Sequence, residues 1–343
     1  MNELQAYMVH EYVADFKAGH LGRRDLVRRV LNITGGVGTT ATLLLALGCS
    51  SSAGGGGSAA AATAVKPAAA PAASPGPSPS PGSSPSPSVL PSPSPLPHSP
   101  LAVAPNDPTS DGQDITFQGA DGATIMAYQA RMKGTNGALP LVLVCHQNRG
   151  LNEHIRDVVR RFAKEGYIAC GVDLVSRQGG TAKISDPNQF SALLTGPNVN
   201  ADQFVSDFKS AVTYYQSKPD LVQFDKLAMN GFCFGGGVVW RSTTQIPQLR
   251  AAAPWYGAPP PLDQVGNIKA AVLGIYSSDP NDFANNGRDQ LEQALTVAKV
   301  THQFNVYPGT MHAFNDDTGP AYNQDQALAA WRDMINWFKE HLA

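Results

Sequence analysis

Apolar and polar positions along residues 110–343 follow two patterns, one typical of strands and the other typical of helices. The run LPLVLVCH at 139–146 is almost continuously apolar, as expected for a strand that is covered on both faces. Residues 114–133 predict a hairpin with its turn at Asp121-Gly122. Further strand-like runs are YIACGVDL, KLAMNGF, LRAAAPWYG, IKAAVLGIYSS and HQFNVYPG.

Helical patterns separate these runs. Residues 152–166 place apolar side chains at helical spacing and end at Gly166. Residues 201–219 predict a second helix, and QDQALAAWRDMINWFKEHL predicts a long closing helix. Strand and helix in alternation indicate the α/β class, a mostly parallel sheet with helices on both faces.

Ligands of such sheets bind beyond the carboxyl ends of the strands. Side chains that directly follow the predicted strands are therefore the candidates for function: His146, Gln147, Asn148, Asp173, Cys233, Asp279 and His312.

The pentapeptide GFCFG at 231–235 has the form of a nucleophile elbow with cysteine at its tip. Gly231 and Gly235 would let the backbone turn sharply, and the following helix N-terminus would favour the thiolate of Cys233. The backbone N–H groups of Phe234 and Asn148 are the expected oxyanion hole. A glycine-rich turn around a buried, inert thiol is the alternative for these five residues.

The order of the later motifs supports the elbow, which expects an acid after a later strand and then a histidine. SSDPNDF provides Asp279 or Asp282, of which we favour Asp279, and YPGTMHAFND provides His312. His312 is the histidine that lies between the last predicted strand and the closing helix. Asp173 is expected to cap a turn.

The front of the chain has a different composition. Residues 1–49 carry Arg23-Arg24 ahead of a moderately apolar stretch that ends at Cys49, as in twin-arginine and lipoprotein export signals. Residues 50–109 are rich in Pro, Ser, Ala and Gly, which predicts a disordered tether. We expect export to the periplasm or cell surface and membrane attachment through an N-terminal anchor helix or a lipid on Cys49.

Charge and metal-ligand spacing narrow the choice of function further. The formal net charge of −2 argues against nucleic acid as a partner. No paired His or Cys has the spacing of zinc ligands, so we expect neither a metal nor a cofactor. His146 is expected in the wall of the site and His154 on a helix surface, while Cys145 and Cys170 fit buried thiols.

Together, GFCFGG, LGIYSSD, YPGTMHAFND and the loop HQNRGLNEHI resemble the dienelactone hydrolase (carboxymethylenebutenolidase) family over residues 110–343. SRQGG at 176–180 resembles its exported members. The resemblance implies the α/β-hydrolase fold, with Cys233 attacking an ester carbonyl, His312 moving the proton and Asp279 orienting the histidine.

Two features depart from the family pattern. Gln147 stands where a glutamate usually helps to switch the cysteine between thiol and thiolate, and His146 precedes it. Asp316 and Asp317 would repel an anionic substrate, which favours an uncharged ester or lactone. The hypothesis is a small-molecule hydrolase, and the alternative is a weakly active or non-catalytic binding module on the same fold.

Overall fold

The computed structural model describes residues 98–186, 189–196 and 199–343, together with residues 9, 12–13, 16, 21–34, 40–42 and 44. The chain divides into two units, one made of Met1–Cys49 with Leu96–Ala343 and the other of Ser50–Pro95. The second unit, Cys49 and most of the predicted signal lie outside the described residues.

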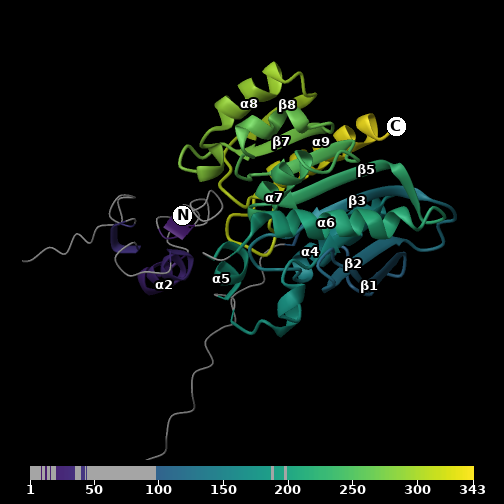
Figure 1. Cartoon of the computed structure of the whole chain (residues 1–343), viewed down its shortest axis with the longest axis horizontal. Helices are drawn as coiled ribbons and strands as arrows, with labels where there is room; N and C mark the ends of the chain where they lie inside the picture. Colours follow the sequence, from purple (N-terminus) through teal and green to yellow (C-terminus); the bar gives the residue numbers. More distant parts are fainter. Residues whose placement is uncertain are drawn as a thin grey trace, which may run out of the picture. The chain divides into compact units, whose positions relative to one another are not determined.

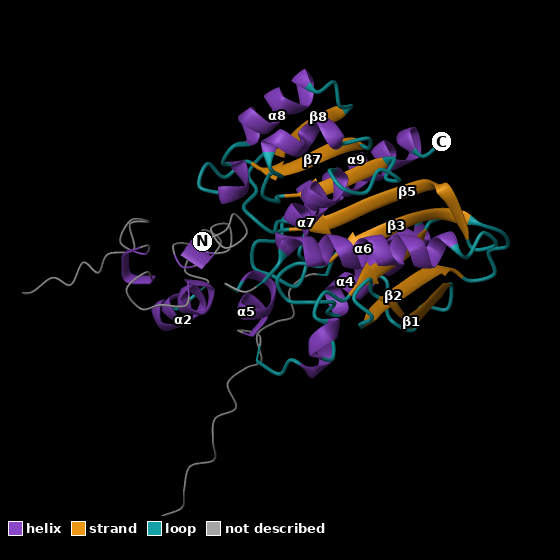
Figure 2. Ribbon diagram, viewed as in Figure 1, coloured by secondary structure: helices purple, strands orange, loops and turns teal. Residues whose placement is uncertain are grey.

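An eight-stranded sheet in the order β1-β2-β4-β3-β5-β6-β7-β8 forms the centre of the domain (Figures 1 and 2). The strands are β1 (Ser110–Gln118), β2 (Thr124–Met132), β3 (Leu139–Cys145), β4 (Ile168–Val172), β5 (Val222–Phe232), β6 (Ala251–Trp255), β7 (Ala271–Ser277) and β8 (His302–Tyr307). β2 pairs antiparallel with β1 and β4, and the other pairings are parallel. The predicted α/β class and the hairpin at 114–133 are confirmed.

Helices cover both faces of the sheet. They are α4 (Glu153–Lys164), α6 (Ala201–Gln216), α7 (Phe234–Thr243), α8 (Arg288–Val297) and α9 (Gln324–His341), whereas the short helix α5 (Gln189–Thr195) lies away from the sheet. Phe162 of α4 stacks on Trp331 and Phe338 of α9, so these helices share one face. Phe204 of α6 meets Phe234 of α7, and Figure 2 shows both helices across the other face. Between these layers the central strands are buried along most of their length, as their apolar runs predict.

Short 3-10 turns complete the loops beyond the strands. They are η1 (Ser176–Gln178), η2 (Thr181–Lys183), η3 (Leu262–Asn267) and η4 (Phe283–Asn285). Arg177 of the SRQGG segment bonds Asp207 of α6 through two contacts of 2.8 Å and also contacts Asp121 in the hairpin turn. SRQGG therefore fastens the β1–β2 turn to α6.

The described part of the predicted tether, residues 98–109, lies along α4, and we call it the strap. Val103 N donates to Asp157 at 2.6 Å, Val103 O accepts from Arg160 at 2.7 Å, and Asp107 pairs with Lys164 at 2.8 Å. Ser99 N donates to the buried Asp317 at 2.7 Å. The strap therefore belongs to the folded domain, which extends before residue 110, because backbone groups of this Pro- and Ala-containing segment satisfy buried side chains.

The described part of the N-terminal segment contains α2 (Arg23–Thr34), in which Leu26, Val30 and Ile33 form a buried face while Arg23 and Arg24 are exposed. Within the described residues, every helix is too short or too polar to cross a membrane.

Candidate active site

Cys233 stands at the turn between the end of β5 and the start of α7. Its backbone has φ 59° and ψ −121°, a conformation that is costly for a residue with a side chain. Cys233 N donates to Trp255 O at 3.0 Å, and Gly237 N donates to Cys233 O at 3.2 Å, so hydrogen bonds on both sides hold the turn. The sharp, strained turn that GFCFG predicts is confirmed.

The two glycines of the elbow are required by close packing. A Cβ on Gly231 would lie 2.6 Å from Gly235 O, and a Cβ on Gly235 would lie 2.5 Å from His146 O. Both distances are shorter than any Cβ contact allows. The elbow therefore rests directly on the loop that follows β3 and carries Asn148.

His312 lies in the loop between β8 and α9, and its partner is Asp282. Nδ1 of His312 is 3.1 Å from Oδ1 of Asp282. Because a carboxylate only accepts, Nδ1 donates and Nε2 carries the lone pair that can take a proton. Burial raises the pKa of Asp282, but the charge of His312 and hydrogen bonds from His312, Ser277 and Ala284 N outweigh it and hold that pKa below its usual value.

The expectation that Asp279 orients His312 is wrong. Asp279 is partly exposed and accepts from its near neighbour Asn281 at 2.8 Å, so it caps the turn that follows β7. The turn brings the chain back over Ser277, whose hydroxyl donates to Asp282 at 2.5 Å. Asp282 is 2% exposed, as expected for an acid that orients a catalytic histidine from within the protein.

Aromatic rings surround His312. The rings of Tyr256 and Phe283 lie 4.8 and 4.6 Å from the imidazole, centre to centre. Two residues of this wall also have backbones in the left-handed region, Tyr256 with φ 36° and Ala313 with φ 63°. Three of the four non-glycine residues with positive φ in the described chain thus lie at this site, which is typical of functional sites. Trp255, Phe234 and Phe314 are fully buried and pack the core around the site, and Tyr256 is also fully buried, with its ring against His312.

The loop after β3 shows where His146, Gln147 and Asn148 lie. Nδ1 of His146 bonds Gln147 O at 2.6 Å, and Nε2 accepts from Leu174 N at 3.1 Å. Both ring nitrogens are therefore occupied by backbone, and burial lowers the pKa of this fully buried histidine. His146 joins two loops behind the site, so the prediction that it forms the wall is wrong. Asn148 is half-buried at the start of the next turn.

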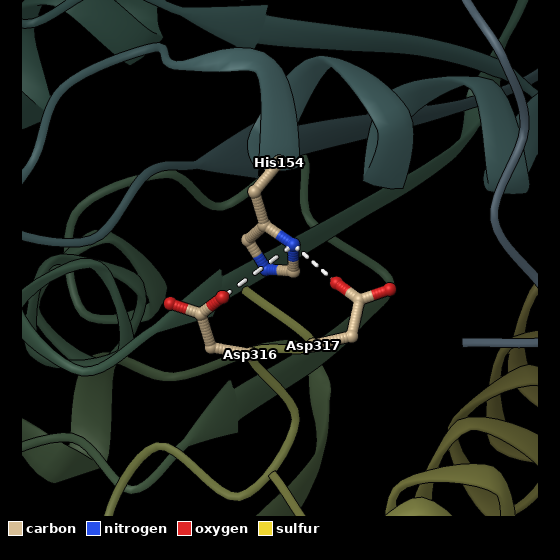
Figure 3. A group of neighbouring side chains, drawn as sticks. All are labelled: His154, Asp316 and Asp317. Atoms are coloured by element: carbon tan, nitrogen blue, oxygen red, sulfur yellow. Dashed lines mark hydrogen bonds and ion pairs between the residues drawn. The ribbon is translucent and has the colours of Figure 1, made fainter. Parts of the chain in front are cut away.

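Gln147 is buried and donates through Nε2 to Oδ2 of Asp316 at 2.7 Å. Asp316 and Asp317 are themselves buried, and His154 lies between them (Figure 3). Gln147 donates to Asp316, and Arg161 donates to Asp317. Their charges are thus balanced inside the protein, which corrects the view that they lie open to repel an anion. His154 is 6% exposed and not on the helix surface, because α4 turns this face inward.

The remaining candidates behave as structural residues. Asp173 accepts from Val175 N and Thr181 N, at 3.2 and 2.7 Å, and so caps the loop after β4 as expected. Cys145 and Cys170 are fully buried and form no disulfide within the described residues. Burial raises the pKa of Cys170 to about 12 and that of Cys145 well above its usual value, so both thiols are inert.

Known proteins share this fold and its motifs. The family model described as "Dienelactone hydrolase family" matches residues 125–342. A "Putative carboxymethylenebutenolidase" of Escherichia coli (strain K12) is 34% identical over 258 residues, which cover 71% of this chain and 92% of that protein. A protein of the same name from Methylorubrum extorquens is 32% identical, over 63% of this chain and 77% of its own.

Solved structures agree with these relatives. The crystal structure of a "Putative Dienelactone Hydrolase" from Klebsiella pneumoniae has a TM-score of 0.62 and 31% identity, and the match covers 67% of this chain and 99% of that one. A dienelactone hydrolase-like protein from metagenomic libraries, named P91, has a TM-score of 0.61 at 22% identity and supports the fold alone. The chain is therefore a hydrolase with the α/β-hydrolase fold and belongs to the dienelactone hydrolase family.

Proposed function

We propose that the protein hydrolyses a small carboxylic ester or lactone through Cys233, His312 and Asp282. The observation that carries the proposal is the strained backbone at Cys233 together with the hydrogen bond between His312 and Asp282. In that bond, Nδ1 of His312 is 3.1 Å from Oδ1 of Asp282. A nucleophile on such a turn and a histidine oriented by an ionised acid are the elements that acyl transfer requires.

In the first half of the reaction, the thiol of Cys233 gives its proton to Nε2 of His312 and the sulfur attacks the carbonyl carbon. The negative charge on the carbonyl oxygen would be stabilised by the backbone N–H groups of Phe234 and Asn148. The C–O bond then breaks, and the leaving alkoxide takes the proton from His312. An acyl group remains on Cys233 as a thioester. With a lactone, the leaving oxygen stays attached to that acyl group.

In the second half, water gives a proton to His312 and attacks the thioester. The C–S bond breaks, sulfur regains the proton, and the acid is released. Asp282 stays ionised throughout and stabilises the imidazolium, in line with the lowered pKa of its carboxyl group.

The side chains beside this site favour an uncharged substrate. The rings of Tyr256 and Phe283 lie against His312. Aromatic rings offer no charged partner to a carboxylate, so they disfavour binding of an anionic group beside them.

The experiment compares the wild type with Cys233→Ala on p-nitrophenyl acetate and on an uncharged enol-lactone. We expect hydrolysis to fall at least about a thousandfold in the variant, the order seen when a catalytic nucleophile is removed. Mass spectrometry of the wild type with a slow ester should show an acyl adduct on Cys233. Equal rates for the two proteins would instead support a binding module on the hydrolase fold, which is the competing interpretation.

We also propose that residues 1–49 direct export and that the protein is attached to a membrane outside the cytoplasm. Arg23-Arg24 before an apolar stretch and Cys49 before the Pro-rich segment support this proposal. Expression with Arg23→Lys and Arg24→Lys together should retain the protein inside the cell, and mass analysis of the mature N-terminus would detect a lipid on Cys49. Unchanged export of the double variant would contradict it.

A further inference from the structure

His154 lies in the first turn of α4 between two carboxylates that follow the proposed catalytic histidine along the chain (Figure 3). Its Nδ1 is 2.9 Å from Oδ1 of Asp317 and 3.8 Å from Oδ1 of Asp316. All three residues are at most 6% exposed. A buried histidine between two buried acids is costly unless the group is fully hydrogen-bonded.

The hydrogen bonds of the cluster are complete. Oδ2 of Asp317 accepts from Arg161 at 2.8 Å and from Ser99 N at 2.7 Å, while its Oδ1 faces His154. Oδ2 of Asp316 accepts from Gln147, and its Oδ1 accepts from Thr318 N at 3.0 Å. Every carboxylate oxygen thus has a donor of the protein's own. Although the ligand atoms lie within 4.8 Å of one another, a cation would have to displace these donors, and the cluster is an ion-pair network.

The same donors act on the protonation of both acids. Burial raises the pKa of Asp316, but the charge of His154 and bonds from Thr318 and Gln147 outweigh it and hold that pKa below its usual value. Burial likewise opposes ionisation of Asp317, and His154, Arg161 and Ser99 N bring its pKa far below the usual range. Both carboxylates are therefore charged when the protein is folded at neutral pH.

The network connects two loops that the proposed mechanism uses. Asp316 and Asp317 are four and five residues beyond His312 and lie in the same loop between β8 and α9. Through Asp316, the network reaches Gln147, which directly precedes the proposed oxyanion donor Asn148. His154 itself stands on a rigid helix whose N-cap is Asn152.

We propose that His154 is a positioning residue of the active site, which sets the loop of His312 and, through Asp316 and Gln147, the loop of Asn148. The inference rests on the proposed function, because both loops matter only if Cys233 performs acyl transfer. A shift of about 1 Å in either loop would misplace a proton acceptor or an oxyanion donor and reduce the rate by about 100-fold.

The test uses the full-length protein with His154→Leu and His154→Asn. Leucine removes the donor, whereas the asparagine amide can replace Nδ1 as a donor to Asp317. We expect His154→Leu to lower kcat by about 10-fold to 100-fold with KM changed less than twofold, and His154→Asn to recover much of the loss. Equal kcat in the wild type and His154→Leu would overturn the inference, as would equal losses in the leucine and asparagine variants.

A matched control separates positioning from general stability. Tyr215→Phe removes a fully buried hydrogen bond, 2.7 Å long, between α6 and Gln129 in β2, far along the chain from both loops. We expect it to lower thermal stability comparably while kcat stays near the wild-type value. A similar fall in kcat in Tyr215→Phe would show that stability alone accounts for the effect and would overturn the inference.

A double-mutant cycle tests the connection to Gln147. If His154 acts on the oxyanion loop through Asp316, the losses in kcat from His154→Leu and Gln147→Ala should be less than additive in the double variant. Additive losses would contradict the connection. Failure of the proposed function would look different, since the wild type and Cys233→Ala would then hydrolyse the ester equally slowly.

Discussion

At the residue scale, the orientation of His312 depends on which of two aspartates in the turn after β7 faces it. Asp282 is buried and bonded to Ser277, Ala284 N and His312, whereas Asp279 is partly exposed and bonded to Asn281. Only a buried, ionised carboxylate can stabilise an imidazolium in a dry site.

We expect Asp282→Asn to reduce kcat/KM for an aryl ester by about 10³-fold to 10⁴-fold, because the amide would favour the wrong tautomer of His312. Steady-state kinetics near pH 7 provide the measurement. Asp279→Asn is the matched control and should stay within about threefold of the wild type. A larger loss in the Asp279 variant would restore that residue as the orienting acid.

Gln147 gives a second prediction. Changing Gln147→Glu would remove the amide donor to Asp316 and place two carboxylates within hydrogen-bond distance, so at least one would have a raised pKa. We expect this variant to be less stable than the wild type at pH 7 and to recover as the pH falls toward 5, because protonation relieves the repulsion. Urea unfolding at both pH values would show this.

Gln129→Glu is the control for that experiment, since Tyr215 can still donate to the new side chain. A Gln147→Glu protein whose stability changes between pH 7 and pH 5 as little as that of the wild type would contradict the predicted repulsion.

Sequence reasoning identified Cys233 and His312 because each lies beyond the carboxyl end of a strand. It ranked Asp282 second to Asp279 as the orienting acid, and it placed His154 on a helix surface. The apolar residues of 152–166 predict which face of the helix is buried. The sequence does not indicate that His154 on this helix contacts two aspartates more than 160 positions later. Likewise, the hydrogen bond from Ser277 to Asp282 brings the segment SSDPND back over the end of β7. The positions of the two aspartates in the sequence do not predict this bond.

At the element scale, the strap is the part of the fold that the amino-acid composition did not predict. Proline and small residues continue from the tether into residues 98–109, yet backbone groups of this segment bond Asp157, Arg160 and Asp317. The strands and helices of 110–343 were predictable because burial on two faces imposes apolar runs, whereas a segment that binds through its backbone needs no such pattern.

Ser99 allows this element to be tested. Ser99→Pro removes the N–H that donates to Asp317, while Ser99→Ala keeps it. We expect the proline variant to lose about 1–3 kcal/mol of unfolding free energy, the cost of leaving a buried acceptor with one donor fewer. Urea unfolding measures this, and equal losses in the two variants would show that the backbone N–H does not matter.

At the scale of the whole molecule, the buried acids predict how stability depends on pH. Asp282, Asp316 and Asp317 have folded-state pKa values below those of an unfolded aspartate, about 3.9. Their contribution is fully present above that value and is lost as the pH falls through the lower folded-state values.

We therefore expect the midpoint of urea unfolding to be nearly constant between pH 7 and pH 5 and to fall steeply below about pH 4. An Asp282→Asn protein should show a shallower fall, because one of the three acids is removed. A stability that rises below pH 4 would contradict the sign of these shifts.

The strap also decides where a recombinant fragment of this enzyme can begin. A fragment cut at residue 110, the boundary that composition suggests, would lack Ser99 N and Val103 N, and Asp317 and Asp157 would each lose a donor inside the protein. A fragment that begins near Leu96 keeps both. For expression and crystallisation, the fragment that begins at residue 110 should therefore be avoided.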